Sequence, residues 1–308
     1  PEGRITPLCL GLWDDATATA LQDKLHRARK LAPPVPVCIQ LAHAGRKASS
    51  AAPWQGGQLL PPEQGGWSTV GPSPIPHLTQ EAAPHELDAQ GLEHIKQAFA
   101  KAAQRAEAMG IEAIELHGAH GYLLHQFLSP IANHRTDNYG GNFDNRTRFP
   151  MEVFEAVRAV YKGSLGMRIS ASDWVEGGWT PEETADFSLR LKLAGADFVH
   201  ISSGGVASQQ KIALGPDYQV PFAKLVKQKT GMPTITVGLI TEPQQAEDIL
   251  ARGDADLIAM ARAFLYKPRW VWEAAAALNG KVVASPQYWR CMPREAQGIF
   301  DAVHMGQR

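Results

Sequence analysis

Short apolar runs alternate with longer amphipathic stretches along the chain, and this alternation limits the folds that the chain can adopt. Six runs are short and almost continuously apolar, as expected of parallel strands that are buried on both faces. The predicted strands are 35–41, 111–116, 165–170, 198–202, 233–237 and 256–260. Parallel strands need crossover connections, which helices usually provide. The sequence therefore predicts an α/β fold built from repeated strand–helix units.

Helical patterns lie between the predicted strands and continue after the last one. They cover residues 17–31, 88–109, 150–161, 181–193, 221–229, 243–251, 270–278 and 294–303. Pro150 and Pro181 stand at predicted first turns, where the missing N–H of proline is tolerated. Gly110 and Gly195 lie just beyond predicted helix ends, where glycine is common.

Two architectures satisfy such a repeat, a (β/α)₈ barrel and an open doubly wound sheet. No Gly-x-Gly-x-x-Gly motif opens a helix, which disfavours the dinucleotide-binding open sheet. A TIM barrel needs about eight strands. The sequence predicts six, and Pro1–Arg4 resembles the middle of a loop. We therefore expect an N-terminally incomplete TIM barrel whose first two strands are absent from this sequence.

An incomplete barrel has a physical consequence. Its two open edges would carry unpaired N–H and C=O groups. Its interior would also be uncovered, including side chains such as Ile39, Leu116, Ile169 and Ile201 if they point inward. We therefore expect a molecule made only of these residues to be unstable or aggregated, because exposing several apolar side chains costs many kcal/mol.

Composition excludes several classes of function. The formal net charge of −1 offers no basic field that would attract nucleic acid or an anionic membrane. No apolar run approaches the roughly 18 residues of a membrane span. The cysteines, Cys9, Cys38 and Cys291, form no CxxC pair, which excludes a disulfide framework and an iron–sulfur cluster. A reducing, cytoplasmic location is the expectation.

The densest group of polar side chains follows the second predicted strand, in Glu115–His125. A turn there can bring His117 and His120 to one side, with Tyr122 close by. Two imidazoles could hold a carbonyl or nitro oxygen on which charge develops, and a tyrosine could protonate a carbanion-like carbon. Histidines satisfied in the core, or a metal-binding pair, are the alternatives.

Two further polar residues lie in predicted strands. Gln40 ends the first one and could bind a planar heterocycle. Arg168 lies inside another, where a charge is costly unless it is paired. Arg168 could stabilise an anionic ring, or it could form a structural ion pair, for instance with Glu115.

The ends of the last two predicted strands suggest a phosphate site. The loops after strands seven and eight of such barrels often bind phosphate. Gly238 lies in the first of these loops, and Ala261 and Arg262 lie in the second. A small residue admits backbone N–H groups, and an arginine can bind phosphate with two hydrogen bonds. A plain surface arginine is the alternative.

The chain is predicted to form a single domain over 1–308, with two unusual segments. Residues 53–86 are rich in proline and contain two Gly-Gly pairs, so they form either a surface insertion or a lid over the site. Residues 279–308 follow the last strand and contain Tyr288, Trp289 and Arg290. Two aromatic residues beside an arginine are typical of an interface, here a homodimer or a dimer of dimers.

Several long motifs together resemble the old yellow enzyme family of FMN-dependent ene-reductases, in its bacterial, thermophilic-like branch. The resemblance runs from Pro1 to Arg308, and the family's first two strands have no counterpart in the sequence. The motifs that carry it are 40–46, 115–122, 133–141, 145–149, 167–173 and 288–290. Two departures are Ala261, where glycine is usual, and Asn142-Phe143-Asp144, where Ser-x-Glu is usual.

The resemblance implies roles for the candidate residues. Gln40 and Arg168 would contact the flavin ring of FMN, and Gly238, Ala261 and Arg262 would hold its phosphate. His117 and His120 would bind the activating oxygen of the substrate, and Tyr122 would supply the proton. Arg290 would reach the active site of a neighbouring subunit.

The sequence thus predicts an FMN-dependent oxidoreductase. It would take hydride from NADPH or NADH and reduce the C=C bond of α,β-unsaturated carbonyl or nitro compounds. A metal-dependent barrel hydrolase that uses His117 and His120 is one alternative, and a non-catalytic or inactive barrel fragment is another. An iron–sulfur enoyl-CoA-type reductase is excluded by the cysteine count.

Overall fold

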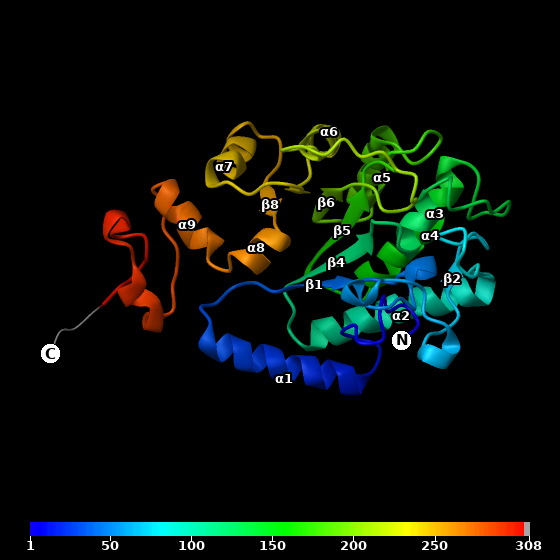
Figure 1. Ribbon diagram of the computed structural model, residues 1–308, viewed down its shortest axis with the longest axis horizontal. Coiled ribbons are helices and arrows are strands. Elements are labelled where there is room, and N and C mark those ends of the chain that lie inside the picture. The colour runs from blue at the N-terminus through cyan, green and yellow to red at the C-terminus, as the bar shows by residue number, and fades with distance from the viewer. Residues whose placement is uncertain (305–308) are drawn as a thin grey trace.

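The computed structural model describes residues 1–304, and its centre is one parallel sheet (Figure 1). The strands follow the order β1-β4-β5-β6-β7-β8, and the sheet is curled like part of a barrel wall (Figure 1). Their bounds are β1 Cys38–Leu41, β4 Ala113–Gly118, β5 Ser164–Ser170, β6 Phe198–Ser202, β7 Thr234–Val237 and β8 Leu257–Ala259. All six predicted strands are confirmed, with shifts of a few residues at their ends.

Helices connect the strands and pack outside the sheet (Figure 1). Their bounds are α1 Asp15–Leu31, α2 Ala89–Ala108, α3 Leu123–Leu128, α4 Phe143–Arg158, α5 Pro181–Leu193, α6 Val220–Thr230, α7 Pro243–Ala251, α8 Arg262–Tyr266 and α9 Trp270–Ala277. Sequence periodicity missed the two shortest, α3 and α8, because five or six residues hold too little of a helical repeat.

Two helix predictions were wrong. Pro150 does not begin a helix but lies inside α4. This helix begins at Phe143, with Asn142 as its N-terminal cap. The Asn142 side chain accepts a hydrogen bond from Asn145 N at 3.0 Å, so a cap outweighs the proline signal. Residues 294–303 are not an α-helix either, since only Arg294–Ala296 form a 3₁₀ turn.

Alternation along the strands gives the sheet two different faces. The face toward the helices is apolar: Leu116, Ile169 and Ile201 are fully buried in the main core. The opposite face carries polar side chains at alternate positions along the strands, and strand pairing aligns them with one another. They are Gln40, Glu115, His117, Arg168 and His200.

The prediction that the apolar side chains could line a barrel interior was therefore wrong. Leu116, Ile169 and Ile201 pack against helices, and Ile39 contacts the same core cluster. The physical reason is the two-residue period of a strand, which places them on the face opposite to Glu115 and Arg168. The concave face is therefore chemically suited to a polar ligand.

The segment 53–86 is irregular and is anchored to the body at several points. It contains two 3₁₀ turns, Pro53–Gln55 and Pro62–Gln64. Two short strands, β2 Val70–Gly71 and β3 His85–Glu86, pair in parallel. Arg135 donates to Leu87 O at 2.7 Å and to Pro72 O at 3.2 Å, so it braces the carboxyl ends of both strands. The role of the segment as a lid stays a prediction.

The C-terminal part projects from the body of the molecule beyond α9 (Figure 1). It forms a small apolar cluster of its own around Phe300, Ile299 and Ala284. Residues 305–308, the end of the predicted interface segment, lie outside the described residues. Among residues 1–304, none of the helices has the length and apolarity that crossing a bilayer requires.

Candidate active site

The three predicted catalytic residues come together at the carboxyl end of β4. His117 Nε2 and His120 Nδ1 lie 3.3 Å apart. The ring of His117 also lies 5.1 Å from the ring of Tyr122, measured between centroids. Strand β4 fixes His117, and the turn that follows carries His120 and Tyr122 to the start of α3. The sequence-based grouping of these residues is thus present in the structure.

The turn has a conformation that few sequences can adopt. His120 and Gly121 both have positive φ angles, of 57° and 72°. A Cβ atom on Gly121 would lie 2.2 Å from the carbonyl oxygen of Gly205, which is far too close. Glycine is therefore required at position 121 both for its backbone angle and for the close approach of the neighbouring loop.

Both imidazoles in the turn are neutral. Burial lowers the pKa of His117 to about 3 and that of His120 to about 2, and the positive charge of Arg168 adds to both effects. A neutral imidazole offers one N–H donor and one nitrogen acceptor. The pair can therefore hold an oxygen by hydrogen bonding without becoming cationic at neutral pH.

Hydrogen bonds orient the ring of His120. Its Nε2 lies 2.7 Å from Ser202 Oγ on β6, and its Nδ1 faces His117. His117 Nδ1 is buried and has no partner among residues 1–304. Ser202 Oγ also donates to Gln219 Oε1 at 3.3 Å, so the direction of the proton between Ser202 and His120 sets which ring nitrogen of the pair can donate to a substrate oxygen.

Arg168 lies directly beside the histidine pair on the concave face. It is the register partner of His117 on β4 and of His200 on β6. Its Nε atom is buried without a partner, and no ion pair of residues 1–304 includes Arg168. The alternative of an ion pair with Glu115 was therefore wrong.

Glu115 has other partners, which explains why Arg168 is unpaired. Its Oε2 lies 2.7 Å from His200 Nδ1, and its Oε1 accepts from Gln40 Nε2 at 2.5 Å. Burial raises the pKa of Glu115, but His200, Gln40 and Arg168 outweigh that effect and hold it below the ordinary value. The carboxylate thus holds the Gln40 amide in place at the β1 edge of the concave face.

Lys47 is a residue of the site that the sequence patterns did not reveal. It lies in a 3₁₀ turn, Gly45–Lys47, and donates to the carbonyl oxygens of His120 and Gly205 at 2.9 and 3.0 Å. Its ammonium lies 5.2 Å from the centroid of the Tyr122 ring. Its only sequence signal is its place seven residues after Gln40, in the segment that follows β1.

The predicted phosphate residues follow neighbouring strands. Gly238 comes directly after β7, and Ala261 and Arg262 come just after β8, where Arg262 begins α8. Gly238 has a φ of 118°, and a Cβ atom there would lie 2.4 Å from Gln219 Nε2. Close packing of Gln219 thus gives a second reason for glycine at this position. Arg262 is exposed, with no hydrogen bond or ion pair to residues 1–304.

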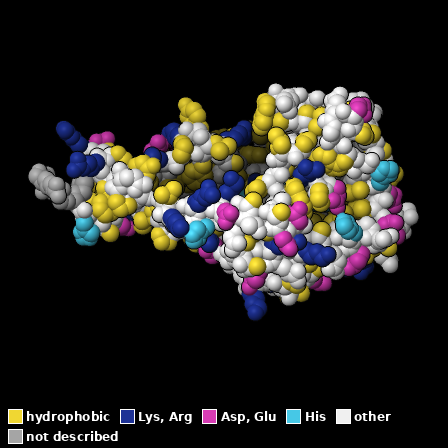
Figure 2. All heavy atoms as spheres, turned by 90° about the horizontal axis from the view of Figure 1, so that it is seen from below, with side chains coloured by type: hydrophobic (Ala, Val, Ile, Leu, Met, Phe, Trp, Pro, Cys, Tyr) yellow, Lys and Arg dark blue, Asp and Glu magenta, His cyan; other side chains and the backbone are white. Residues whose placement is uncertain are grey.

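These residues fit FMN as the group that the site would hold. An unpaired guanidinium at Arg168, with its buried orphan Nε, suits a planar ring that carries negative charge. The free Arg262 at the carboxyl edge of the same sheet suits a phosphate. Figure 2 shows that the molecule is hollowed near its middle when it is seen from below.

Arg290 is not brought to the histidine pair of its own chain. It is exposed in a 3₁₀ turn, Pro286–Cys291, of the projecting C-terminal part (Figure 1). Arg269 braces this turn, because its guanidinium lies 4.4 Å from the Trp272 ring and 4.2 Å from the Tyr288 ring. A role of Arg290 toward a second subunit stays a proposal.

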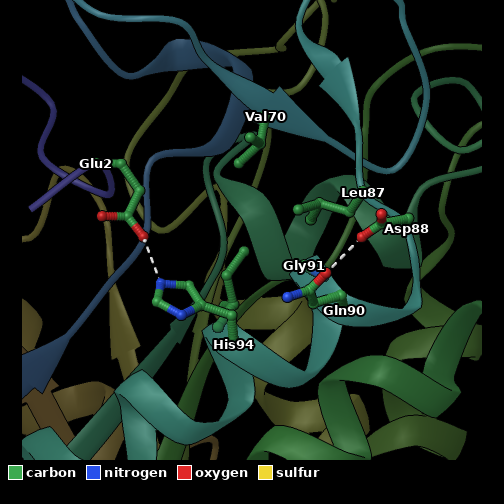
Figure 3. Close-up of a pocket in the computed structure, with 8 residues that line it drawn as sticks. Glu2, Val70, Leu87, Asp88, Gln90, Gly91 and His94 are labelled. Atoms are coloured by element: carbon green, nitrogen blue, oxygen red, sulfur yellow. Dashed lines mark hydrogen bonds and ion pairs between the residues drawn. The ribbon is translucent and has the colours of Figure 1, made fainter.

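A separate pocket of about 330 Å³ lies at the start of α2, away from the histidine pair (Figure 3). The imidazole of His94 closes one side, with its Nε2 in a hydrogen-bond contact of 3.2 Å with Glu2 Oε1. The Asp88 side chain on the other side caps α2 by accepting from Gly91 N at 2.8 Å. Glu2, His94 and Asp88 are thus already paired, and the pocket adds nothing to the candidate site.

The chain is similar to curated proteins that are named NADPH dehydrogenases. The chain is 41% identical over 290 residues to an NADPH dehydrogenase of Geobacillus thermodenitrificans (strain NG80-2), and the match covers 94% of this chain and 80% of that protein. It is 38% identical over 290 residues to the NADPH dehydrogenase of Bacillus subtilis (strain 168), with the same coverage.

Solved structures agree with the fold. Morphinone reductase matches with a TM-score of 0.64 and 25% identity, covering 82% of this chain and 68% of that chain. A 2-naphthoyl-CoA reductase matches with a TM-score of 0.73 and 25% identity, covering 88% of this chain and 42% of that chain.

The model of one protein family matches residues 1–280, which is most of the chain. Together with the relatives, this match confirms the resemblance seen in the motifs and the expected use of FMN and NAD(P)H. The chain belongs to the NADH:flavin oxidoreductase / NADH oxidase family, as an NAD(P)H-dependent flavin oxidoreductase.

Proposed function

We propose that this protein uses electrons from NAD(P)H to reduce the C=C bond of α,β-unsaturated carbonyl or nitro compounds. The observation that carries the proposal is the convergence of two neutral imidazoles, a phenol and an unpaired guanidinium at one end of the sheet. The two imidazoles are suited to bind an oxygen on which negative charge develops, and the phenol is suited to protonate a carbon. The curled sheet and the TM-scores support a TIM-barrel arrangement of this site.

Each side chain of the site would have a role that follows from its chemistry. Bound FMN would supply the hydride to the β-carbon of the alkene. His117 and His120 would bind the substrate oxygen by hydrogen bonding and polarise the double bond. Tyr122 would deliver a proton to the α-carbon, and burial raises the pKa of its phenol above the ordinary value, so it is protonated at neutral pH.

The cofactor residues would act by charge and by shape. Arg168 would stabilise the negative charge on the bound ring system, since its guanidinium has no carboxylate partner in residues 1–304. Gln40, held by Glu115, would contact the ring at the β1 edge. Gly238, Ala261 and Arg262 would hold the phosphate.

A comparison of wild type with Tyr122→Phe tests this function. NADPH oxidation is measured with cyclohexenone as acceptor, and reduction of the bound flavin by NADPH is measured separately by its absorbance. The variant should reduce its flavin at a normal rate and bind phenols normally. Its reduction of the enone should slow by roughly 10²–10⁴, the usual loss of a general acid. Full enone turnover by Tyr122→Phe, or none by wild type, contradicts the proposal.

A further inference from the structure

A buried hydrogen-bond network lies directly beneath the turn that carries His120 and Tyr122. The backbone N–H of Gly121 donates to His125 Nδ1 at 2.8 Å. On the other side of the ring, His125 Nε2 lies 2.8 Å from Asp173 Oδ1. His125 and Asp173 are both 0% exposed. The network therefore joins the turn after β4 to the loop after β5 through the core of the protein.

Asp173 is itself fixed by two more donors. Ser129 Oγ donates to its Oδ2 at 2.6 Å, and Trp179 N donates to the same oxygen at 2.8 Å. Burial raises the pKa of Asp173, but the hydrogen bonds from His125, Ser129 and Trp179 outweigh it and keep the pKa below the ordinary value. The carboxylate is thus an ionised acceptor in a site that water does not reach.

The geometry allows one tautomer of His125. Because Nδ1 accepts from Gly121 N–H, that nitrogen has no proton. The ring proton is therefore on Nε2, where it is donated to Asp173. A buried backbone N–H that loses its acceptor costs free energy, so the carboxylate controls whether the Gly121 N–H can be satisfied.

We infer that His125 and Asp173 are positioning residues that hold the His117–Tyr122 turn in its substrate-binding shape through the tautomer of His125. Gly121 lies between His120 and Tyr122, so a shift of its N–H moves both side chains. His120 N is also fixed, by Ser170 Oγ at 2.9 Å, and Gly121 O accepts from Gln126 Nε2 at 2.7 Å. Neither His125 nor Asp173 is exposed to a substrate, so neither acts as a catalytic residue.

A change in the tautomer of His125 tests this inference. The inference rests on the proposed function only where it describes the turn as substrate-binding. In Asp173→Asn, the amide can still accept from Ser129 or Trp179, but its NH₂ group would face His125 Nε2. The ring proton should then move to Nδ1, where it opposes the Gly121 N–H. Ser129→Ala is the matched control, because it removes a donor to Asp173 and leaves the His125 contact intact.

The readouts are independent of alkene turnover. In the FMN-loaded protein, ¹⁵N NMR should show His125 protonated on Nε2 in wild type and in Ser129→Ala, and on Nδ1 in Asp173→Asn. Affinity for a phenol such as 4-nitrophenol should fall roughly tenfold only in Asp173→Asn, about the effect of one buried hydrogen bond. The rate at which NADPH reduces the flavin should change less than about threefold.

A second pair of variants covers the case in which Asp173→Asn fails to fold. Asn at position 125 places an acceptor oxygen near the position of Nδ1, whereas Leu of similar size places none. Both lose the contact to Asp173, so their difference isolates the bond to Gly121. His125→Asn should bind the phenol roughly tenfold more tightly than His125→Leu.

Three results would overturn the inference. The first is a reversed tautomer in Asp173→Asn with unchanged phenol affinity. The second is an equal loss of phenol affinity, flavin content and flavin reduction, which indicates a general role in stability. The third is equal phenol binding by His125→Asn and His125→Leu. If wild type binds phenols but reduces no alkene, the proposed function fails while these comparisons still decide the positioning role.

Discussion

Lys47 donates a hydrogen bond of 2.9 Å to the carbonyl oxygen of His120, so a partly buried amine holds the turn of the candidate active site at the residue next to Gly121, whose N–H is held by His125. The same amine donates to Gly205 O at 3.0 Å, and no ion pair of residues 1–304 includes it. Lys47 thus ties two loops together as an ammonium without a carboxylate partner.

The partly buried Lys47 should make the stability of the protein depend on alkaline pH. Burial lowers its pKa from 10.5 to about 8. Below about pH 8 the cost of burying the charge is fully present, and it is relieved as the pH rises from about 8 to 10.5. Wild type should therefore gain up to about 3 kcal/mol of stability relative to Lys47→Met across this range. Urea unfolding of both proteins at several pH values measures the difference. If the two free energies of unfolding change with pH in parallel, the pKa of Lys47 is not lowered by burial.

The neutral histidine pair should make the protein sensitive to mild acid. The folded pKa values of His117 and His120 lie at about 3 and about 2, against 6.5 for the free side chain. Stability is thus fully present above about pH 6.5 and is lost as the pH falls below it, because the unfolded chain binds the protons first. Between about pH 6.5 and 5, wild type should lose roughly 2 kcal/mol per histidine more than a His117→Gln/His120→Gln variant.

Urea unfolding at these pH values checks that prediction. His43, whose pKa is lowered to about 4 by burial, is present in both proteins, so its effect cancels in the difference. Equal losses of stability in wild type and variant would show that the two imidazoles are not buried as neutral rings.

Arg262 should contribute to FMN affinity through the phosphate. Arg262→Ala removes a charge-assisted hydrogen bond worth about 1.5–3 kcal/mol, so FMN affinity should fall by roughly 10- to 150-fold. Quenching of FMN fluorescence on binding to the flavin-depleted protein measures this. Arg27→Ala is a suitable control, since Arg27 is an exposed arginine on α1. If Arg262→Ala and Arg27→Ala bind FMN with equal affinity, Arg262 is a surface arginine that does not bind the phosphate.

Arg290 should act on a neighbouring subunit. Arg290→Ala should weaken substrate binding without releasing FMN, because this side chain is exposed on the projecting C-terminal part and not beside its own histidine pair. When Arg290→Ala subunits are mixed with Tyr122→Phe subunits, a mixed dimer should contain one site with both defects and one with neither. Recovered activity in the mixture supports a role of Arg290 in the active site of the neighbouring subunit, and a fully active monomer rules this role out.

The sequence by itself predicted the six strands of the main sheet and most of the helices in their order, and it indicated which residues could be catalytic. The apolar runs identified all six strands of the main sheet, since hydrophobic patterns depend only on local positions, and they missed the two-residue strands β2 and β3. His117, His120 and Tyr122 could be grouped because one short turn contains them. The motifs also indicated the family, and the family match confirmed it.

Only the tertiary structure decided which side chains are partners. Glu115 pairs with His200, 85 residues away, and leaves Arg168 unpaired. His125 meets Asp173 across 48 residues, and Lys47 meets His120 across 73. Such contacts depend on strand register and on loop packing, which no local pattern encodes. The same register placed Leu116 and Ile169 against the helices and turned the polar row toward the concave face.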